Sequence, residues 1–148
     1  MEILSLLGDQ SAEIIKAALK TLSCANLKSY SKSSEQENKT RLLNLLALTQ
    51  QCIKEKNLLP MTEYAGKIAN ERYKSGFDLY EVHSAFNVLE QELWNRIVKN
   101  SKPEKLGESL GYISTVLGAG KESLALTYVS LASKHKTETL NLEEIFNR

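Results

Sequence analysis

The sequence predicts an all-α fold, an antiparallel bundle of about five helices, for which a globin-like arrangement is one option. Apolar residues recur at spacings of three and four along most of the chain, and only two prolines occur among its 148 residues. No segment alternates apolar and polar side chains as a half-buried strand would. This length suits a single domain that buries its core without disulfides or metals.

The first helix is expected to run from Ile3 to about Cys24, with a break at Gly8-Asp9. Its apolar positions recur at helical spacing and are Ile3, Leu6, Leu7, Ile14, Ile15, Ala18, Leu19 and Leu22. The first ten residues lack a basic start, and Asp9 interrupts their apolar run. We therefore expect neither a signal peptide nor a membrane span, and a cytoplasmic location.

A loop and a helix start follow. Residues 25–33 lose the helical period and gather serine, which is typical of a connecting loop. Ser34 with Glu37, or Ser33 with Gln36, forms a capping-box pattern, in which each side chain bonds to the other's free backbone amide.

The second helix is predicted from one apolar face. That face consists of Leu42, Leu45, Leu46, Thr49, Cys52 and Ile53, with Leu43 and Ala47 broadening it. Lys54 and Lys56 close the helix, where positive charge is favourable beside the negative end of the helix dipole.

The third helix begins near Pro60, which is tolerated in a first turn. Its apolar positions are Met61, Tyr64, Ala65, Ile68, Ala69 and Tyr73. Gly76 follows the basic end of this helix and suits a left-handed C-terminal cap. We therefore expect a tight hairpin around Gly76.

The fourth helix has the strongest local start signal in the chain. Asp78 can cap the amide near Glu81, and Phe77 can pack on Val82 as a hydrophobic staple. The buried seam of this helix is predicted to be Val82, Phe86, Leu89, Leu93 and Ile97, and its end lies near Asn100.

The last helix follows Pro103 and carries two stripes. Its apolar positions, close to the 3.5-residue period of bundles, are Leu106, Leu110, Ile113, Leu117, Leu124, Tyr128 and Leu131. The second stripe consists of the small residues Gly107, Gly111, Ser114, Gly118 and Ala125. Each interior glycine costs about 1 kcal/mol against alanine, so close approach of another helix is the expected gain. The approaching helix could belong to the same chain and pack on Gly107, Gly111 and Gly118. It could instead belong to a second copy of the chain in a symmetric dimer.

Composition limits the partners and cofactors. Lys plus Arg number 19 and Asp plus Glu 18, a net charge of +1, so we expect no nucleic acid and no membrane surface as partner. Cys24 and Cys52 form no CxxC pattern and are interpreted as small hydrophobic residues. Motifs for phosphate loops, zinc proteases and hydrolase nucleophiles are missing from the sequence. We therefore expect no catalytic residues, no metal and no cofactor.

One polar stripe on the fourth helix leaves two interpretations open. His83, Asn87, Glu90 and Trp94 recur at i, i+4, i+7 and i+11. They could form the polar edge of a ligand cavity, with His83 as a haem ligand, or His83 could be a half-buried residue bonded to a neighbour. His135, between two lysines, is interpreted as a surface residue.

The chain divides into a helical domain of residues 1–132 and an extension of residues 133–148. The extension keeps Leu140, Leu142 and Ile145 among charged residues. It is either a frayed end or a helix that connects the domain to an output.

Residues 72–82, RYKSGFDLYEV, continuing through Phe86, Leu89 and Leu93, resemble the RsbRD-type N-terminal domain. This domain stands at the front of RsbT co-antagonist proteins and of some sensor histidine kinases, and the resemblance extends loosely over residues 1–132. A departure is Glu90, which follows Leu89 where the family pattern has a basic residue.

The resemblance implies a non-enzymatic sensory or regulatory input domain of a bacterial signalling system. Such a domain acts by helix repacking and protein contact, and its partner or output domain is of the kinase or anti-sigma antagonist type. A homodimer is a further expectation. The alternative is a small-ligand or haem-binding helical protein that uses His83.

Overall fold

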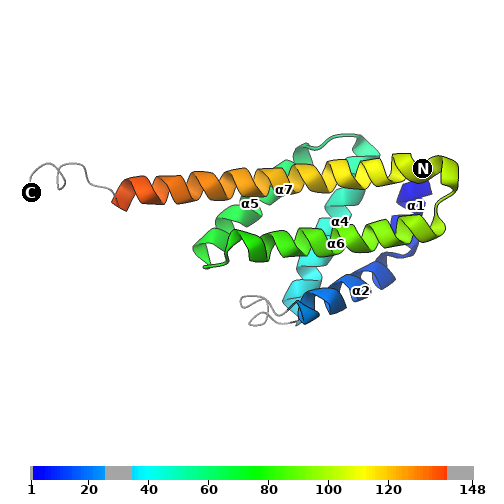
Figure 1. Ribbon diagram of the computed structural model, residues 1–148, viewed down its shortest axis with the longest axis horizontal. Coiled ribbons are helices and arrows are strands. Elements are labelled where there is room, and N and C mark those ends of the chain that lie inside the picture. The colour runs from blue at the N-terminus through cyan, green and yellow to red at the C-terminus, as the bar shows by residue number, and fades with distance from the viewer. Residues whose placement is uncertain (1, 26–34, 140–148) are drawn as a thin grey trace, which may run out of the picture.

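The computed structural model describes residues 2–25 and 35–139, and the side chains among them up to residue 134. These residues form six helices and no strand, which confirms the all-α prediction. The helices are α1 (Glu2–Asp9), α2 (Ser11–Cys24), α4 (Glu35–Glu55), α5 (Leu59–Lys74), α6 (Leu79–Asn100) and α7 (Pro103–Thr139), labelled as in Figure 1. The predicted loop, except residue 25, and both serines of the predicted capping boxes fall on residues 26–34, outside the described residues.

The expected first helix is in fact two helices that meet at Gln10. Its backbone leaves the helical conformation, with φ −105° and ψ 13°, one residue after the predicted break. The change of direction lets both pieces bury their apolar residues, because Ile3 and Leu7 of α1 and Ile14 and Ile15 of α2 all lie in the core. This division is why the described bundle has one helix more than expected.

Helix α7 is the central element of the bundle. It runs antiparallel beside α6 and packs along α5, and these two helices are its most extensive contacts. Helix α4 crosses behind α6 and α7 at a steep angle, while α2 covers the other side of α6 (Figure 1). A globin-like form of this arrangement stays a prediction.

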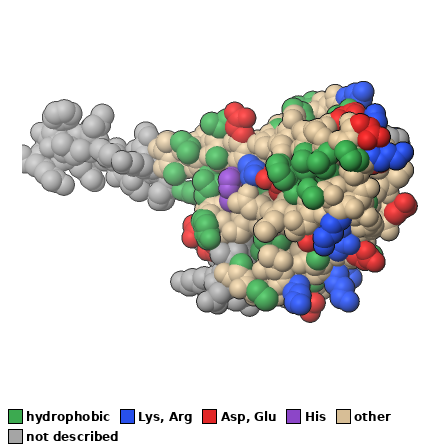
Figure 2. Space-filling view, turned by 45° about the vertical axis from the view of Figure 1, so that its right-hand side comes forward, with side chains coloured by type: hydrophobic (Ala, Val, Ile, Leu, Met, Phe, Trp, Pro, Cys, Tyr) green, Lys and Arg blue, Asp and Glu red, His purple; other side chains and the backbone are tan. Residues whose placement is uncertain are grey.

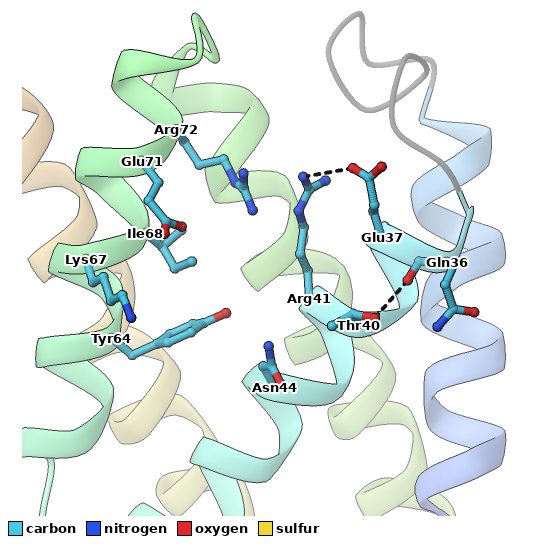
Figure 3. Close-up of a pocket in the computed structure, with 10 residues that line it drawn as sticks. All are labelled: Gln36, Glu37, Thr40, Arg41, Asn44, Tyr64, Lys67, Ile68, Glu71 and Arg72. Carbon is cyan, nitrogen blue, oxygen red and sulfur yellow. Dashed lines mark hydrogen bonds and ion pairs between the residues drawn. The ribbon is translucent and has the colours of Figure 1, made fainter.

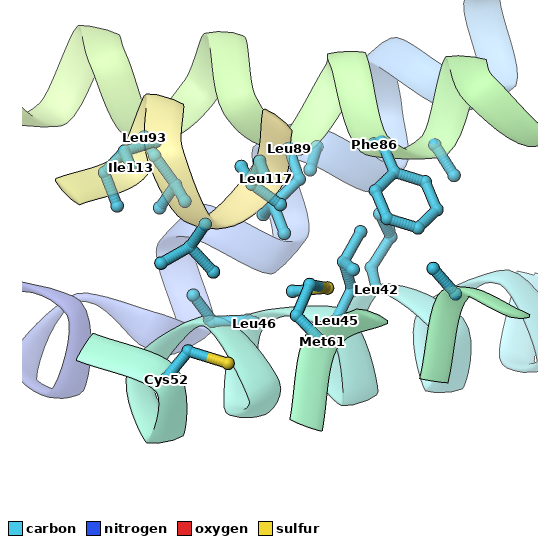
Figure 4. Close-up of a cluster of buried hydrophobic side chains, with 14 of the residues drawn as sticks. Leu42, Leu45, Leu46, Cys52, Met61, Phe86, Leu89, Leu93, Ile113 and Leu117 are labelled. Atoms are coloured by element: carbon cyan, nitrogen blue, oxygen red, sulfur yellow. The ribbon is translucent and has the colours of Figure 1, made fainter. Parts of the chain in front are cut away.

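The predicted buried seams of α4 and α6 are confirmed. All six residues predicted for the face of α4 and all five predicted for the seam of α6 are buried. Figure 4 shows several of them, Leu42, Leu45 and Leu46 of α4 and Phe86, Leu89 and Leu93 of α6, in one cluster with Ile113 and Leu117 of α7 and Met61 of α5. The predicted broadening of α4 is wrong, because Leu43 is 41% exposed and Ala47 is exposed. Both residues lie on the side of α4 that no other described helix covers.

The α5–α6 hairpin forms as predicted. Gly76 has φ +85°, and its amide donates to the Tyr73 carbonyl at 3.2 Å, while the Phe77 amide donates to the Arg72 carbonyl at 3.0 Å. These two bonds are those of a Schellman motif, which requires the left-handed residue that glycine supplies. Asp78 then begins α6, since its Oδ1 accepts the Glu81 amide at 2.9 Å.

The close approach to α7 occurs at a different glycine from those predicted. A Cβ built on Gly107, Gly111 or Gly118 would meet no atom within 4 Å among the described residues, whereas one on Gly120 would lie 2.9 Å from Phe86 Cε1 and 3.0 Å from Met61 Cγ. Gly120 faces the core between α5 and α6. Gly107, Gly111 and Gly118 point away from the core, so no close packing of this stripe against another described helix is found, and the dimer seam stays a prediction.

This contrast gives a matched test of packing at α7. Gly118→Ala adds a methyl group in open space and should gain about 1 kcal/mol of helix propensity. Gly120→Ala has the same propensity gain but overfills the space beside Met61 and Phe86, which typically costs about 1–3 kcal/mol. Urea denaturation should therefore find Gly120→Ala less stable than Gly118→Ala by about 1–3 kcal/mol. Equal stabilities would contradict the close approach at Gly120.

Candidate functional site

The polar stripe of α6 lies on the flank that faces α7. His83 and Glu90 are half-buried, and Asn87 and Trp94 are exposed. Lys121 of α7 reaches across, and its Nζ donates to Asn87 Oδ1 and to Glu90 Oε1, each at 3.1 Å. Two of the four predicted ligand residues are thus bonded to a lysine that fixes α6 against α7.

The small-residue stripe of α7 lies on the same face. Lys121 follows Gly118 by three residues and Ser114 by seven, so all three share one side of α7. Since Lys121 bonds to the stripe of α6, the two stripes predicted separately lie side by side. Sequence analysis missed Lys121, although its spacing continues the small-residue stripe and could have shown that it belongs there.

This α6–α7 face is open and partly apolar. Trp94 is 41% exposed, and Val98, one turn further along α6, is 58% exposed. Figure 2 shows hydrophobic side chains gathered on this face, next to a histidine with a basic and an acidic side chain beside it. The face is an exposed surface, which suits contact with another protein better than enclosure of a small molecule.

Metal ligands and thiols are two further kinds of candidate site among the described residues, where Cys24 is exposed. No group of three or more His, Cys, Asp or Glu side chains among them could hold a metal ion. Cys52 is buried, and burial is the main reason that the pKa of its thiol is raised, which disfavours the reactive thiolate. In the same ranges, no helix has both the length and the apolar content needed to cross a membrane. The side chain of His135 lies outside the described residues.

A second candidate site is a pocket of about 420 Å³ between α4 and α5. It is open to solvent and lined by Gln36, Glu37, Thr40, Arg41 and Asn44 from α4, and by Tyr64, Lys67, Ile68, Glu71 and Arg72 from α5. Figure 3 shows Arg41 and Asn44 of α4 facing Tyr64 and Arg72 of α5 across the gap. We call this pocket the α4–α5 groove. Its size is within the range of small-molecule sites.

Two arginines from different helices meet at one end of the groove. The guanidinium carbon of Arg41 lies 5.7 Å, and that of Arg72 5.4 Å, from the ring centroid of Phe77, distances at which cation–π attraction acts. Arg41 also donates to Asn38 Oδ1 at 3.0 Å and pairs with Glu37 Oε2 at 3.6 Å. Arg72 forms no ion pair with another described residue.

Tyr64 projects into the groove and marks its deeper part. Burial raises the pKa of its phenol above the usual value, with Arg72 and Arg41 acting in the opposite direction. The hydroxyl is therefore protonated at neutral pH and can donate a hydrogen bond. Beside it lies a small recess of about 20 Å³, which shares Arg41, Tyr64, Ile68 and Arg72 with the groove and adds Leu45, Val82, Ala85 and Phe86.

The turn at Phe77 connects the groove to α7. The Phe77 carbonyl accepts a hydrogen bond from Tyr128 Oη at 3.0 Å, and Tyr128 packs edge-on against Tyr73 with centroids 5.6 Å apart. Tyr128 is the last buried position of α7 whose side chain is described. Beyond it the helix continues to Thr139 and projects past the other helices (Figure 1).

No family model matches the chain, and no curated protein matches it significantly. The function must therefore be argued from the two surfaces themselves.

The position of His83 gives a prediction about haem. Its stripe lies on an open flank, and neither the groove nor the recess is lined by His83. Addition of haem to the purified protein should therefore give no Soret shift that depends on His83. A shift present in the parent and lost in His83→Ala would contradict this and support the haem-binding alternative. Asn87→Ala, one turn along the same stripe, is the control for a general disturbance of the flank.

Proposed function

We propose that this chain is a non-enzymatic sensory or regulatory domain of a bacterial signalling system, located in the cytoplasm. It works by a shift in helix packing and by contact with other proteins. The resemblance of residues 72–82 to the RsbRD-type N-terminal domain supports this proposal. A kinase or an anti-sigma antagonist is then the expected class of output partner.

The strongest support for the proposal is that α7 is packed in the core and also extends beyond it. This single helix is packed into the core at Gly120 and Tyr128, and it continues without interruption to Thr139, past the ends of the other helices (Figure 1). It crosses the predicted boundary between residues 132 and 133 as a helix. A rigid helix held in a core can pass a displacement of that core to whatever binds its projecting end.

The α6–α7 face supplies the second part of the proposal, a contact with a second copy of the chain. Gly107, Gly111 and Gly118 leave open space above α7, which lets another helix approach its backbone. Trp94 and Val98 of α6 add apolar area beside them. In a symmetric dimer, two such faces would bury the small-residue stripe against each other. This burial would offset the helix propensity that the glycines of the stripe lose.

Sedimentation tests this contact directly. Gly111→Leu and Gly118→Leu place a large side chain on the proposed interface and should weaken self-association, because the partner helix can no longer approach. Gly8→Leu is the matched control, since a Cβ on Gly8 also meets no atom within 4 Å but lies on α1. A parent protein that sediments as a monomer at high concentration, or variants that associate as the parent does, would contradict the proposal.

A further inference from the structure

We propose that the α4–α5 groove binds a small organic anion, in which one carboxylate or phosphate group is attached to an apolar body. The groove is separate from the α6–α7 face and takes most of its lining from α4 and α5. Each part of this ligand corresponds to a part of the groove.

The arginine end of the groove suits an oxyanion. Arg41 and Arg72 approach the same Phe77 ring from two helices, and Figure 3 shows their guanidinium groups facing each other. Glu37 balances part of the Arg41 charge, and an anion between the two guanidinium groups would lower the repulsion that remains between them. Guanidinium groups also match the planar, two-oxygen geometry of carboxylate and phosphate groups.

Arg72 is the arginine best placed to bind such a group. Within the described residues it forms no ion pair, and its ring contact with Phe77 holds the guanidinium at the groove. Lys67, one turn before Glu71 on the same helix, adds a further cation to the lining. Binding therefore need not break any ion pair of Arg72.

The wall of the groove next to the arginines suits an apolar body with a polar atom. Tyr64 and Ile68, like both arginines, also line the recess, whose remaining lining is apolar and includes Val82 and Phe86. The protonated Tyr64 hydroxyl forms no hydrogen bond within the described residues, so it can donate to a ligand. An aromatic ring or a short alkyl chain in the groove of about 420 Å³ would bury apolar surface against this wall. The recess of about 20 Å³ is too small to hold a ring.

The balance of charge limits the ligand to a small anion. The lining has three cations, Arg41, Lys67 and Arg72, and two carboxylates, Glu37 and Glu71. Its net charge is therefore +1. The carboxylates would repel a polyphosphate or a nucleic-acid backbone, while one oxyanion group at the arginine end lies beside the cations.

Occupation of the groove would act on α7 through the turn. An anion bound by Arg41 and Arg72 would hold the Phe77 ring, whose own carbonyl accepts the Tyr128 hydrogen bond at 3.0 Å. This consequence rests on the proposed function, whereas binding itself does not. The groove would then be the input of the domain, and the projecting end of α7 its output.

Calorimetric titration of the full 148-residue chain with four probes tests the proposal. Phenyl phosphate and benzoate carry both an oxyanion and a ring, inorganic phosphate carries only the anion, and benzyl alcohol only the ring. At least one of the first two should bind saturably, and inorganic phosphate and benzyl alcohol should each bind at least about tenfold more weakly. The ratio of the dissociation constants of phenyl phosphate and benzoate tells which oxyanion the arginines prefer.

Variants locate the binding. Arg72→Gln should weaken binding of the better probe at least about tenfold, the loss expected for one charge-assisted contact. Tyr64→Phe, which removes only the hydroxyl, should weaken it severalfold. Lys99→Gln, an exposed cation at the opposite end of α6, is the matched control and should leave the affinity unchanged. Circular dichroism checks that each variant is folded.

Three results would overturn the proposal. They are the absence of saturable binding of both ring-bearing anions, equal affinity of inorganic phosphate and phenyl phosphate, and an affinity unaffected by Arg72→Gln. None of these results bears on self-association through the α6–α7 face, so failure of the ligand site and failure of the proposed function are distinguished by separate measurements.

Discussion

The close packing of α7 against α5 and α6 at Gly120 is the constraint on which the rest of the structure depends. Because Gly120 has no side chain, atoms of Met61 and Phe86 lie about 3 Å from the position that a Cβ would occupy. Ser123 Oγ then donates a hydrogen bond to the Thr62 carbonyl at 2.9 Å, and Tyr128 Oη donates one to the Phe77 carbonyl. A wider separation of α7 from α5 would weaken both bonds, since hydrogen bonds fall off steeply with distance and angle.

This packing also determines where the two candidate surfaces lie. With the Gly120 side of α7 facing the core, its small-residue stripe must face outward beside α6. Lys121 then bonds to α6 and gives that face its polar end. On the other side of the bundle, the α5–α6 turn carries Phe77 to the mouth of the α4–α5 groove. One helix therefore contacts the turn at the groove and forms half of the exposed face.

The sequence predicted what depends on local spacing. The seam of α6 and the Gly76–Asp78 turn follow from contacts between residues a few positions apart, and both are confirmed. It did not predict which glycine would be packed, because helical spacing shows that residues share a face but not which face another helix covers. The groove could not be predicted either. Arg41 and Arg72 are far apart in the sequence, and only the crossing of α4 over α5 brings them to one ring.

Native-state hydrogen exchange along α7 tests most directly whether the bundle holds this helix only as far as Tyr128. The amides between Ile113 and Tyr128 should exchange only through global unfolding, whereas those of residues 132–139 should exchange through local opening. In Tyr128→Phe, which removes the bond to Phe77, this boundary should move toward Leu124. Uniform protection through Thr139, or a boundary unchanged in Tyr128→Phe, would contradict the account.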